Sequence, residues 1–292
     1  MTGLTPPAPR RVAVIGDVAG HLDELRTELV RLGADAVTLE LPPGLLVIQV
    51  GDLIHRGPDS TGVVRLVDRY LSDQPAQWVQ LVGNHEAQYL RQPAFDWPEK
   101  LPTQTAATLQ HWWAHGQLRA AAAISAPTER FLVTHAGLTR GFWTDVLDRF
   151  TDPAKVAAAL NSLIGTHEDV LFSAGQMLGG RRPDRLAGPV WASAGTELLP
   201  SWFGHPLPFS QVHGHASAYD WTERRFRTSK EIARATDVDE QAKHATVTFD
   251  GGRIVGIDPG HSHTARRPWR GWEISLDPDD QPAASVRPTS GT

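Results

Sequence analysis

The stretch Trp-Val-Gln-Leu-Val-Gly-Asn-His-Glu at residues 78–86 is a short apolar run that ends abruptly in a polar loop. Runs of this length, rich in β-branched and aromatic residues, are typical of buried strands. The stretch therefore predicts a strand over 78–82. It also predicts that this strand delivers an amide, an imidazole and a carboxylate, those of Asn84, His85 and Glu86, to a single loop.

Four further apolar runs end in the same way, each followed by Asp or His. The runs and the side chains that follow them are 12–15 with Asp17, 45–50 with Asp52, 131–133 with His135, and 209–212 with His213 and His215. In α/β sheets, ligands bind outside the carboxyl ends of the strands. The five strand ends therefore predict one polar site along one edge of a sheet.

Helical patterns separate the first three runs. Apolar residues recur at helical spacing over 21–33 and 60–71, and Asp59 or the serine after it can cap the second of these helices. The order of strand, helix, strand, helix and strand is that of a parallel α/β sheet. Nearer the C-terminus, residues 246–249 and 253–257 are joined through Asp-Gly-Gly and predict an antiparallel hairpin.

The chain is expected to form a single domain over residues 11–277. An Ala- and Trp-rich helical pattern over 103–123 indicates a helical insertion at about 87–125. The Pro-rich N-terminus, 1–10, is expected to be flexible. The Pro-, Ser- and Asp-rich end, 278–292, is expected to be disordered.

The composition of the 292 residues narrows the possible functions. The chain has no cysteine, which excludes disulfides, thiolate catalysis and Cys-ligated zinc. The net charge of −5 gives no basic field for bulk nucleic-acid binding. No apolar run approaches the roughly 20 residues of a membrane span, and the N-terminus lacks the pattern of a signal peptide. We therefore expect a cytoplasmic protein with no membrane partner.

The strand-end side chains carry donor atoms that bind metals: Asp17, Asp52, Asn84, His135 and His215. Two carboxylates, one amide oxygen and two imidazoles suit first-row divalent ions. A carboxylate has two oxygens, so one Asp can bridge two ions about 3.5–4 Å apart. The set therefore predicts a metal site at the sheet edge.

In order and spacing, the strand-end motifs resemble those of the calcineurin-like metallophosphoesterases, in the branch of the phosphoprotein phosphatases and symmetrical diadenosine tetraphosphate hydrolases. The motifs are Gly-Asp-x-x-Gly at 16–20, Gly-Asp-Leu-Ile-His-Arg-Gly at 51–57, Gly-Asn-His-Glu at 83–86, His-Ala-Gly-Leu at 135–138 and Gly-His at 214–215. The resemblance implies an α/β fold, a β-sandwich of two mixed sheets flanked by helices in α-β-β-α layers. It also implies a metal-dependent hydrolase of phosphoester or phosphoanhydride bonds.

The resemblance implies two divalent metal ions, which would be Mn, Fe, Zn, Ni or Mg. Asp17 would bind the first ion, and Asp52 would bridge it to the second. The second ion would also be held by Asn84, His135 and His215.

For catalysis, the resemblance implies that His85 protonates the leaving oxygen and that the planar donor fork of Arg56 holds the phosphoryl oxygens. A metal-bound hydroxide would attack phosphorus in line. The substrate would be a small phosphorylated molecule, a nucleotide or a phosphoprotein. The string at 51–60 resembles the dinucleotide hydrolases more than the protein phosphatases.

The first departure from the family pattern is Ala19. It stands where the family's Asp-x-His motif has the histidine that completes the first metal site. His21, two residues further on, could replace this ligand. Alternatively, Asp17, Asp52 and waters hold a weaker first site. More distant donors are His213, His261 and His263.

The second departure is His55, where relatives have an Asp that can orient the catalytic histidine. His55 could hydrogen-bond His85 only if the two rings adopt matched tautomers. These departures keep a second hypothesis open. In it, the chain is a ligand-binding or regulatory module on a phosphoesterase fold, with an incomplete first metal site.

Overall fold

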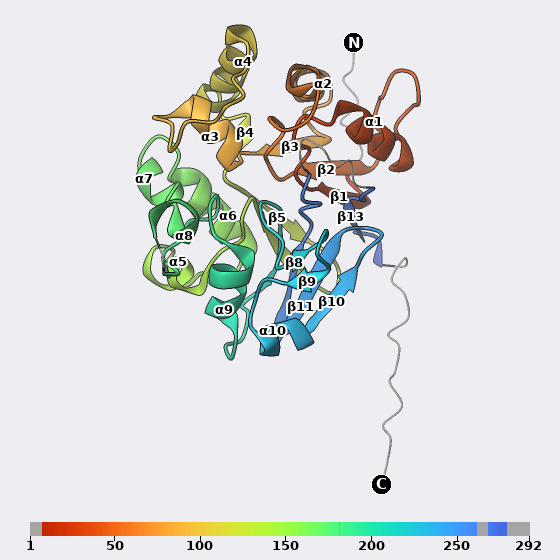
Figure 1. The fold of residues 1–292 in the computed structure, drawn as a ribbon. Helices are drawn as coiled ribbons and strands as arrows, with labels where there is room; N and C mark the ends of the chain where they lie inside the picture. Colours follow the sequence, from red (N-terminus) through yellow and green to blue (C-terminus); the bar gives the residue numbers. More distant parts are fainter. Residues whose placement is uncertain (1–7, 181, 262–267, 279–292) are drawn as a thin grey trace.

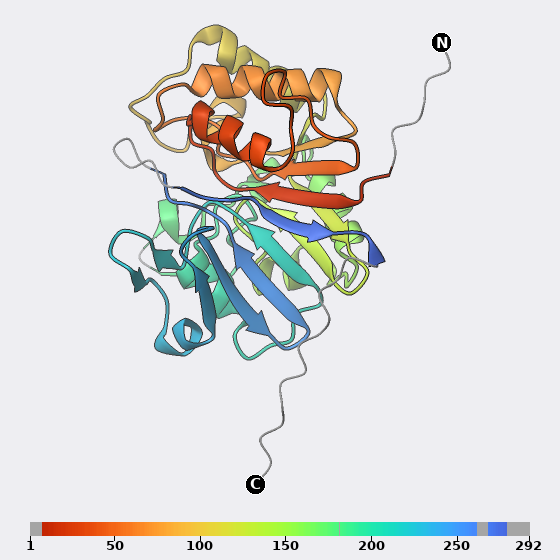
Figure 2. The same cartoon turned by 90° about the vertical axis from the view of Figure 1, so that its right-hand side faces the viewer.

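Two β-sheets pack face to face, and helices cover the outer face of each sheet (Figures 1 and 2). The computed structural model describes residues 8–180, 182–261 and 268–278. The predicted α/β fold, with two mixed sheets in α-β-β-α layers, is confirmed.

The first sheet carries the N-terminal strand ends. Its strands, in spatial order, are β13 (Trp272–Ser275), β1 (Arg11–Ile15), β2 (Leu45–Gln49), β3 (Trp78–Leu81) and β4 (Leu118–Arg119). Strands β1 to β4 are parallel, and β13 is antiparallel to β1. The carboxyl ends of β1, β2 and β3 therefore lie along one edge.

The second sheet carries the later strand ends. Its strands, in spatial order, are β10 (Thr236–Asp239), β11 (His244–Phe249), β12 (Gly252–Gly256), β7 (Ser210–His213), β6 (Arg130–Thr134) and β5 (Ala121–Ser125). Strands β12, β7 and β6 are parallel, whereas the remaining neighbours are antiparallel. The predicted hairpin is present as β11 and β12. A separate antiparallel pair is formed by β8 (Tyr219–Asp220) and β9 (Arg225–Phe226).

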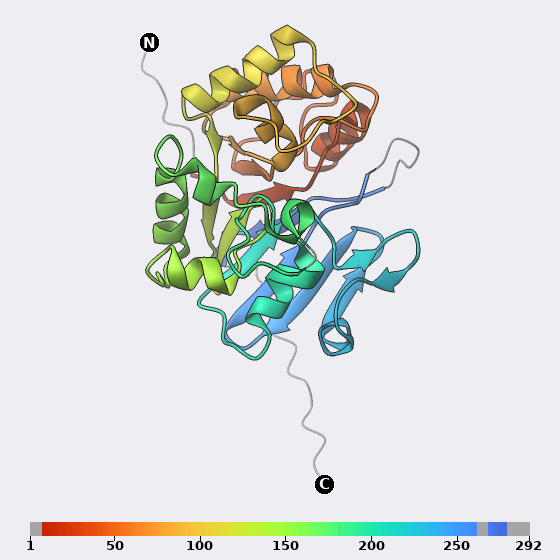
Figure 3. The ribbon, with the colours of Figure 1, turned by 60° about the vertical axis from the view of Figure 1, so that its left-hand side comes forward.

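Two groups of helices cover the sheets. Those over the first sheet are α1 (Leu22–Arg31), α2 (Ser60–Asp73), α3 (Asn84–Leu90) and α4 (Thr103–Ala114). Those on the side of the second sheet are α5 (Arg140–Asp145), α6 (Pro153–Ser162), α7 (Glu168–Leu171), α8 (Gly175–Gly179), the π-helical turn η1 (Ala194–Leu198), α9 (Leu199–Trp202) and α10 (Lys230–Arg234) (Figure 3). The predicted cap of α2 is present, because the Asp59 carboxylate accepts the Gly62 N–H at 2.7 Å.

Strand β1 shows how the layers share one core. Successive side chains of a strand point to opposite faces. Val12 and Val14 pack between the sheets, in the cluster that contains Phe131. Ala13 and Ile15 pack under the helices. Both faces of the strand are buried, which explains its uninterrupted apolar sequence.

The prediction of one long helix over residues 103–123 is wrong beyond Ala114. Helix α4 ends there, Gly116 adopts a φ of +68°, and the chain continues as strands β4 and β5. Glycine accepts this left-handed conformation without strain and so ends helices. Pairing with β6 and packing beneath α6 then make the Ala-rich run a strand. The predicted insertion of about 87–125 therefore contains two strands of the sheets.

In the described residues, no helix has both the length and the apolar character needed to cross a membrane. The expectations for residues 1–7 and 279–292 lie outside the described part of the chain, as does His263.

Candidate metal centre and active site

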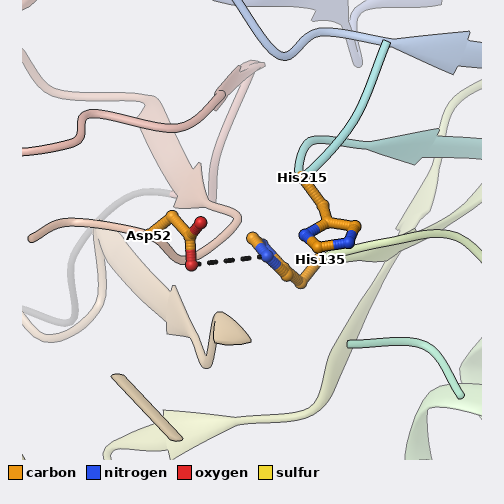
Figure 4. Close-up of side chains that lie close together, drawn as sticks. All are labelled: Asp52, His135 and His215. Carbon is orange, nitrogen blue, oxygen red and sulfur yellow. Dashed lines mark ion pairs between the residues drawn. The ribbon is translucent and has the colours of Figure 1, made fainter. Parts of the chain in front are cut away.

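Five strand ends bring their polar side chains together at the carboxyl edges of the two sheets. Asp17, Asp52 and Asn84 follow β1, β2 and β3, whereas His135 and His215 follow β6 and β7. Figure 4 shows Asp52 on one side and the two imidazoles opposite it. His135 Nε2 lies 3.4 Å from Asp52 Oδ1. Among the described residues, one group of three or more His, Cys, Asp or Glu side chains has all its ligand atoms within 4.8 Å of one another, namely Asp52, His135 and His215.

The hydrogen bonds of the two histidines leave one lone pair of each ring facing inward. His135 Nδ1 donates to the Val50 carbonyl at 2.9 Å, and His215 lies with Nε2 2.9 Å from the weak acceptor Met177 Sδ. Burial lowers the pKa of both imidazoles below the usual range, so the rings are neutral. The remaining lone pairs are therefore on His135 Nε2 and His215 Nδ1.

These lone pairs meet the amide oxygen of Asn84. Asn84 Oδ1 lies 3.0 Å from His135 Nε2 and 2.9 Å from His215 Nδ1. Three acceptor atoms this close repel one another unless a cation lies among them. Ligands at right angles around an ion, each about 2.1 Å away, lie about 3 Å apart. The donor set and its spacing therefore fit the second metal ion that the sequence predicts, with Asp52 beside it.

Asp17 lies close to both Asp52 and the loop of His215. Its Oδ1 accepts the backbone N–H of His215 at 2.9 Å, which links the end of β1 to the end of β7. The close approach requires Gly214, because a Cβ at that position would clash with Asp17 Oδ1. Burial, together with the carboxylates of Asp258 and Asp52, raises the pKa of Asp17 well above its usual range.

Asp258 is a site residue that the sequence patterns missed. It follows β12, whose end touches the end of β1: a Cβ on Gly16 would clash with the Ile257 carbonyl. Its buried carboxylate accepts the Gly260 N–H at 2.7 Å. The sequence carries a signal for it, because residues 253–257 are a sixth apolar run followed by Asp, although the hairpin prediction uses them only as a strand.

His21 lies beside His261 and not within the three-residue group around Asp52. The two rings are 4.5 Å apart at their centroids, and His21 Nδ1 is 3.9 Å from Glu24 Oε2. Ala19, at the family's histidine position, is buried with a φ of +49°. The ring of His213, another distant candidate, is buried against Gly256.

The loops of the site hold backbone strain. Five non-glycine residues in these loops adopt a positive φ: Ala19, Asp52, His55, Arg56 and His215. Each such conformation costs about 1–3 kcal/mol and persists only where the surroundings enforce it. The clustering indicates that the fold is organised around the position of these side chains.

Glu86 holds two of these loops in place through hydrogen bonds to their backbone. Its fully buried carboxylate accepts the backbone N–H groups of Asp52, Leu53 and Gly83, at 2.8, 2.8 and 2.9 Å. The loops after β2 and β3 are thereby fixed to each other. Sequence patterns placed Glu86 in the loop but assigned it no such role.

His85 and Arg56 both contact the ring of Trp97. His85 Nε2 is 3.8 Å from Asp52 Oδ2, and the His85 ring meets the Trp97 ring edge-on at 4.6 Å. Arg56 Cζ lies 5.8 Å from the centre of the same ring, and Arg56 Nη1 donates to the His261 carbonyl at 3.2 Å. Arg56 therefore extends toward the side of the site that carries His21 and His261.

The geometry gathers side chains that could hold a metal ion, and comparison with known proteins points to a family in which such a site is expected. The sequence model described as calcineurin-like phosphoesterase matches residues 10–239. The chain belongs to this family. The family resemblance of the motifs is thereby confirmed.

Two curated relatives are described as asymmetrical bis(5'-nucleosyl)-tetraphosphatases PrpE. The chain is 40% identical to that of Halalkalibacterium halodurans over 74 residues and 35% identical to that of Oceanobacillus iheyensis over 77 residues. These segments are 25% and 26% of this chain, and 29% and 30% of the relatives. The matched segment thus spans less than a third of either relative.

Among solved structures, the fold is similar to that of the cold-active protein-tyrosine phosphatase of a psychrophilic Shewanella species. The TM-score is 0.52 with 16% identity, over 91% of this chain and 76% of that one. At this identity the likeness concerns the fold alone.

Proposed function

We propose that the protein hydrolyses phosphoester or phosphoanhydride bonds with divalent metal ions. The observation that carries this proposal is the meeting of His135 Nε2, His215 Nδ1 and Asn84 Oδ1 at 2.9–3.0 Å beside Asp52. When bound, the ions would neutralise phosphoryl oxygens and activate a water for attack on phosphorus.

The chain's own residues would orient the substrate around the ions. Asn84, His135 and His215 would hold the second ion, Asp52 would bridge, and Asp17 would face the first ion. Arg56 is placed to donate to phosphoryl oxygens, because its guanidinium fork binds such oxygens in a fixed plane. His85 Nε2, close to Asp52, is the group proposed to face the leaving oxygen.

The substrate proposed is a small molecule with a nucleotide or polyphosphate group. The two curated relatives, named as tetraphosphatases acting on bis(5'-nucleosyl) substrates, support this choice over a phosphoprotein. They are described as asymmetrical enzymes, whereas the motif resemblance named symmetrical ones. The cytoplasmic location expected from the sequence stays a prediction.

A substrate panel tests the proposal. Purified protein would be supplied with Mn²⁺, Ni²⁺, Mg²⁺ or Fe²⁺ and assayed on a diadenosine tetraphosphate, a nucleoside triphosphate, a phosphopeptide and an aryl phosphate. Metal-dependent release of product that chelation abolishes is the expected result. Tight binding of a nucleotide with no turnover under any metal would instead favour the regulatory module.

A further inference from the structure

Three side chains form a hydrogen-bonded row behind the site. His85 Nδ1 lies 2.7 Å from His55 Nδ1, and His55 Nε2 lies 2.7 Å from Tyr89 Oη. His55 is fully buried and His85 is 3% exposed. Both contacts involve ring nitrogens, so the positions of the protons depend on which atoms can donate.

The far end of the row decides the direction of the hydrogen bonds. The Leu101 N–H donates to Tyr89 Oη at 3.1 Å, and the proton of the hydroxyl itself still needs an acceptor. The His55 Nε2 acceptor lies 2.7 Å away. A neutral His55 then carries its proton on Nδ1 and donates it to His85 Nδ1.

With Nδ1 accepting, neutral His85 carries its proton on Nε2. This atom lies 3.8 Å from Asp52 Oδ2, an environment that favours an N–H over a lone pair. The reverse direction would make Tyr89 Oη accept two N–H donors and would turn the Nε2 lone pair of His85 toward the carboxylate. Two independent ends of the row therefore select the same tautomer.

We propose that Tyr89 and His55 are positioning residues that direct the Nε2–H of His85 into the site and leave its Nδ1 without a carboxylate partner, so that the site favours leaving groups that depart as stable anions. A carboxylate at position 55 would instead accept the His85 Nδ1–H and stabilise an imidazolium, a stronger acid. A neutral Nε2–H donates a hydrogen bond but keeps its proton. The leaving groups of phosphoanhydrides and aryl esters depart readily with only a hydrogen bond, whereas the alkoxide of an alkyl ester must receive a proton as it departs.

This inference rests on the proposed hydrolysis and deepens it, because it names the substrate class. Nucleoside polyphosphates release a phosphate or nucleotide anion, whereas phosphoserine and phosphothreonine release an alkoxide. The row of three side chains therefore supports polyphosphate substrates on grounds independent of any relative.

The kinetic test is a series of phosphate esters whose leaving groups range from nitrophenol to a simple alcohol. In the wild type, we expect kcat/KM to fall steeply along the series. His55→Asp restores a carboxylate at a position with φ +71°, which Asp tolerates better than most residues. It should flatten the dependence by raising relative activity on the alkyl ester about tenfold or more. An unchanged slope in a folded His55→Asp protein would overturn the proposal.

The structural test reads the tautomer directly. In ¹⁵N-labelled, metal-free protein, the His85 signal is assigned by its loss in His85→Gln, and we expect the proton on Nε2. Tyr89→Phe should introduce a population with the proton on Nδ1. The matched control is Tyr70→Phe, which removes a buried hydroxyl that donates to Leu39 far from this row. If wild-type His85 carries its proton on Nδ1, the hydrogen bonds of the row run in the opposite direction and the proposal is refuted.

The two measurements separate the proposals. If the protein is not a hydrolase, no ester is turned over, while the spectrum still reports the tautomer. If only the positioning role fails, turnover persists but the slopes of wild type and His55→Asp coincide.

Discussion

The two halves of the metal centre differ in completeness. The half built on β3, β6 and β7 has three neutral metal-ligating atoms that meet at one point, with Asp52 beside them. The half built on β1 and β12 has the carboxylates of Asp17 and Asp258, and Ala19 stands where the family has histidine. Both imidazoles of the group around Asp52 belong to the first half. From this difference we expect one ion to be bound more tightly than the other.

The largest effect is expected where the two halves join. Asp52→Asn keeps the shape and the acceptor oxygen for the His85 N–H at 3.0 Å, but it removes the charge shared by both ions. We expect a loss of at least about 10³-fold in kcat, because charge stabilisation of the transition state is lost. Steady-state kinetics with saturating Mn²⁺ measure it.

The matched control is Asp145→Asn, which alters an exposed pair with Arg185. It should leave kcat within about twofold of the wild type, as surface changes usually do. Retention of most activity by Asp52→Asn would show that the two halves are not coupled through this carboxylate.

We also expect the complete half to be the more rigid, because Glu86 fixes its loops to each other, and a substitution of Glu86 tests this role. Glu86→Gln retains one acceptor oxygen for three backbone N–H donors and turns an NH₂ group toward at least one of them. We expect a loss of about 3 kcal/mol in the free energy of unfolding, the cost of unsatisfied buried donors. Urea unfolding measures it. Glu240→Gln, at an exposed pair with Arg224, should change stability by less than about 0.5 kcal/mol.

The incomplete half is tested by restoring its missing ligand. Ala19→His should be tolerated, because Ala19 has a φ of +49° and histidine accepts this region better than most residues. We expect the weaker Mn²⁺ site to tighten about 10- to 100-fold, measured by calorimetric titration of the metal-free protein. Two equally tight ions in the wild type would remove the contrast between the halves.

The sequence predicted the strand ends better than the path of the chain between them. The strand ends could be placed because apolar runs that stop at Asp, Asn or His report both burial and its end. The Ala-rich segment after Ala114 could not, because alanine favours helix intrinsically and only pairing with β6 makes it a strand. The link from Tyr89 through His55 to His85 depends on how α3 packs against the loop after β2, which no local pattern reports.

The smallest effect is expected in the pH dependence of stability, where the halves should respond in opposite directions. Burial lowers the pKa of His215, so the folded metal-free protein binds fewer protons than the unfolded chain below the ordinary imidazole value of 6.5. Its contribution to stability is therefore lost as the pH falls through that window. Burial raises the pKa of Asp17 above 3.8, so the folded state binds more protons there, and its contribution is lost as the pH rises.

Each group changes the slope of the unfolding free energy against pH by at most about 1.4 kcal/mol per pH unit. Between about pH 4.5 and 6, Asp17→Asn should therefore make the slope of the metal-free protein more positive, and His215→Gln should make it less positive. Urea midpoints in EDTA at several pH values measure both slopes. His215 and Asp17 are neighbours, joined by one hydrogen bond. Slope changes of opposite sign would therefore show that the imidazole and the carboxylate themselves make the two halves differ. Slope changes of the same sign would contradict the division into two unlike halves.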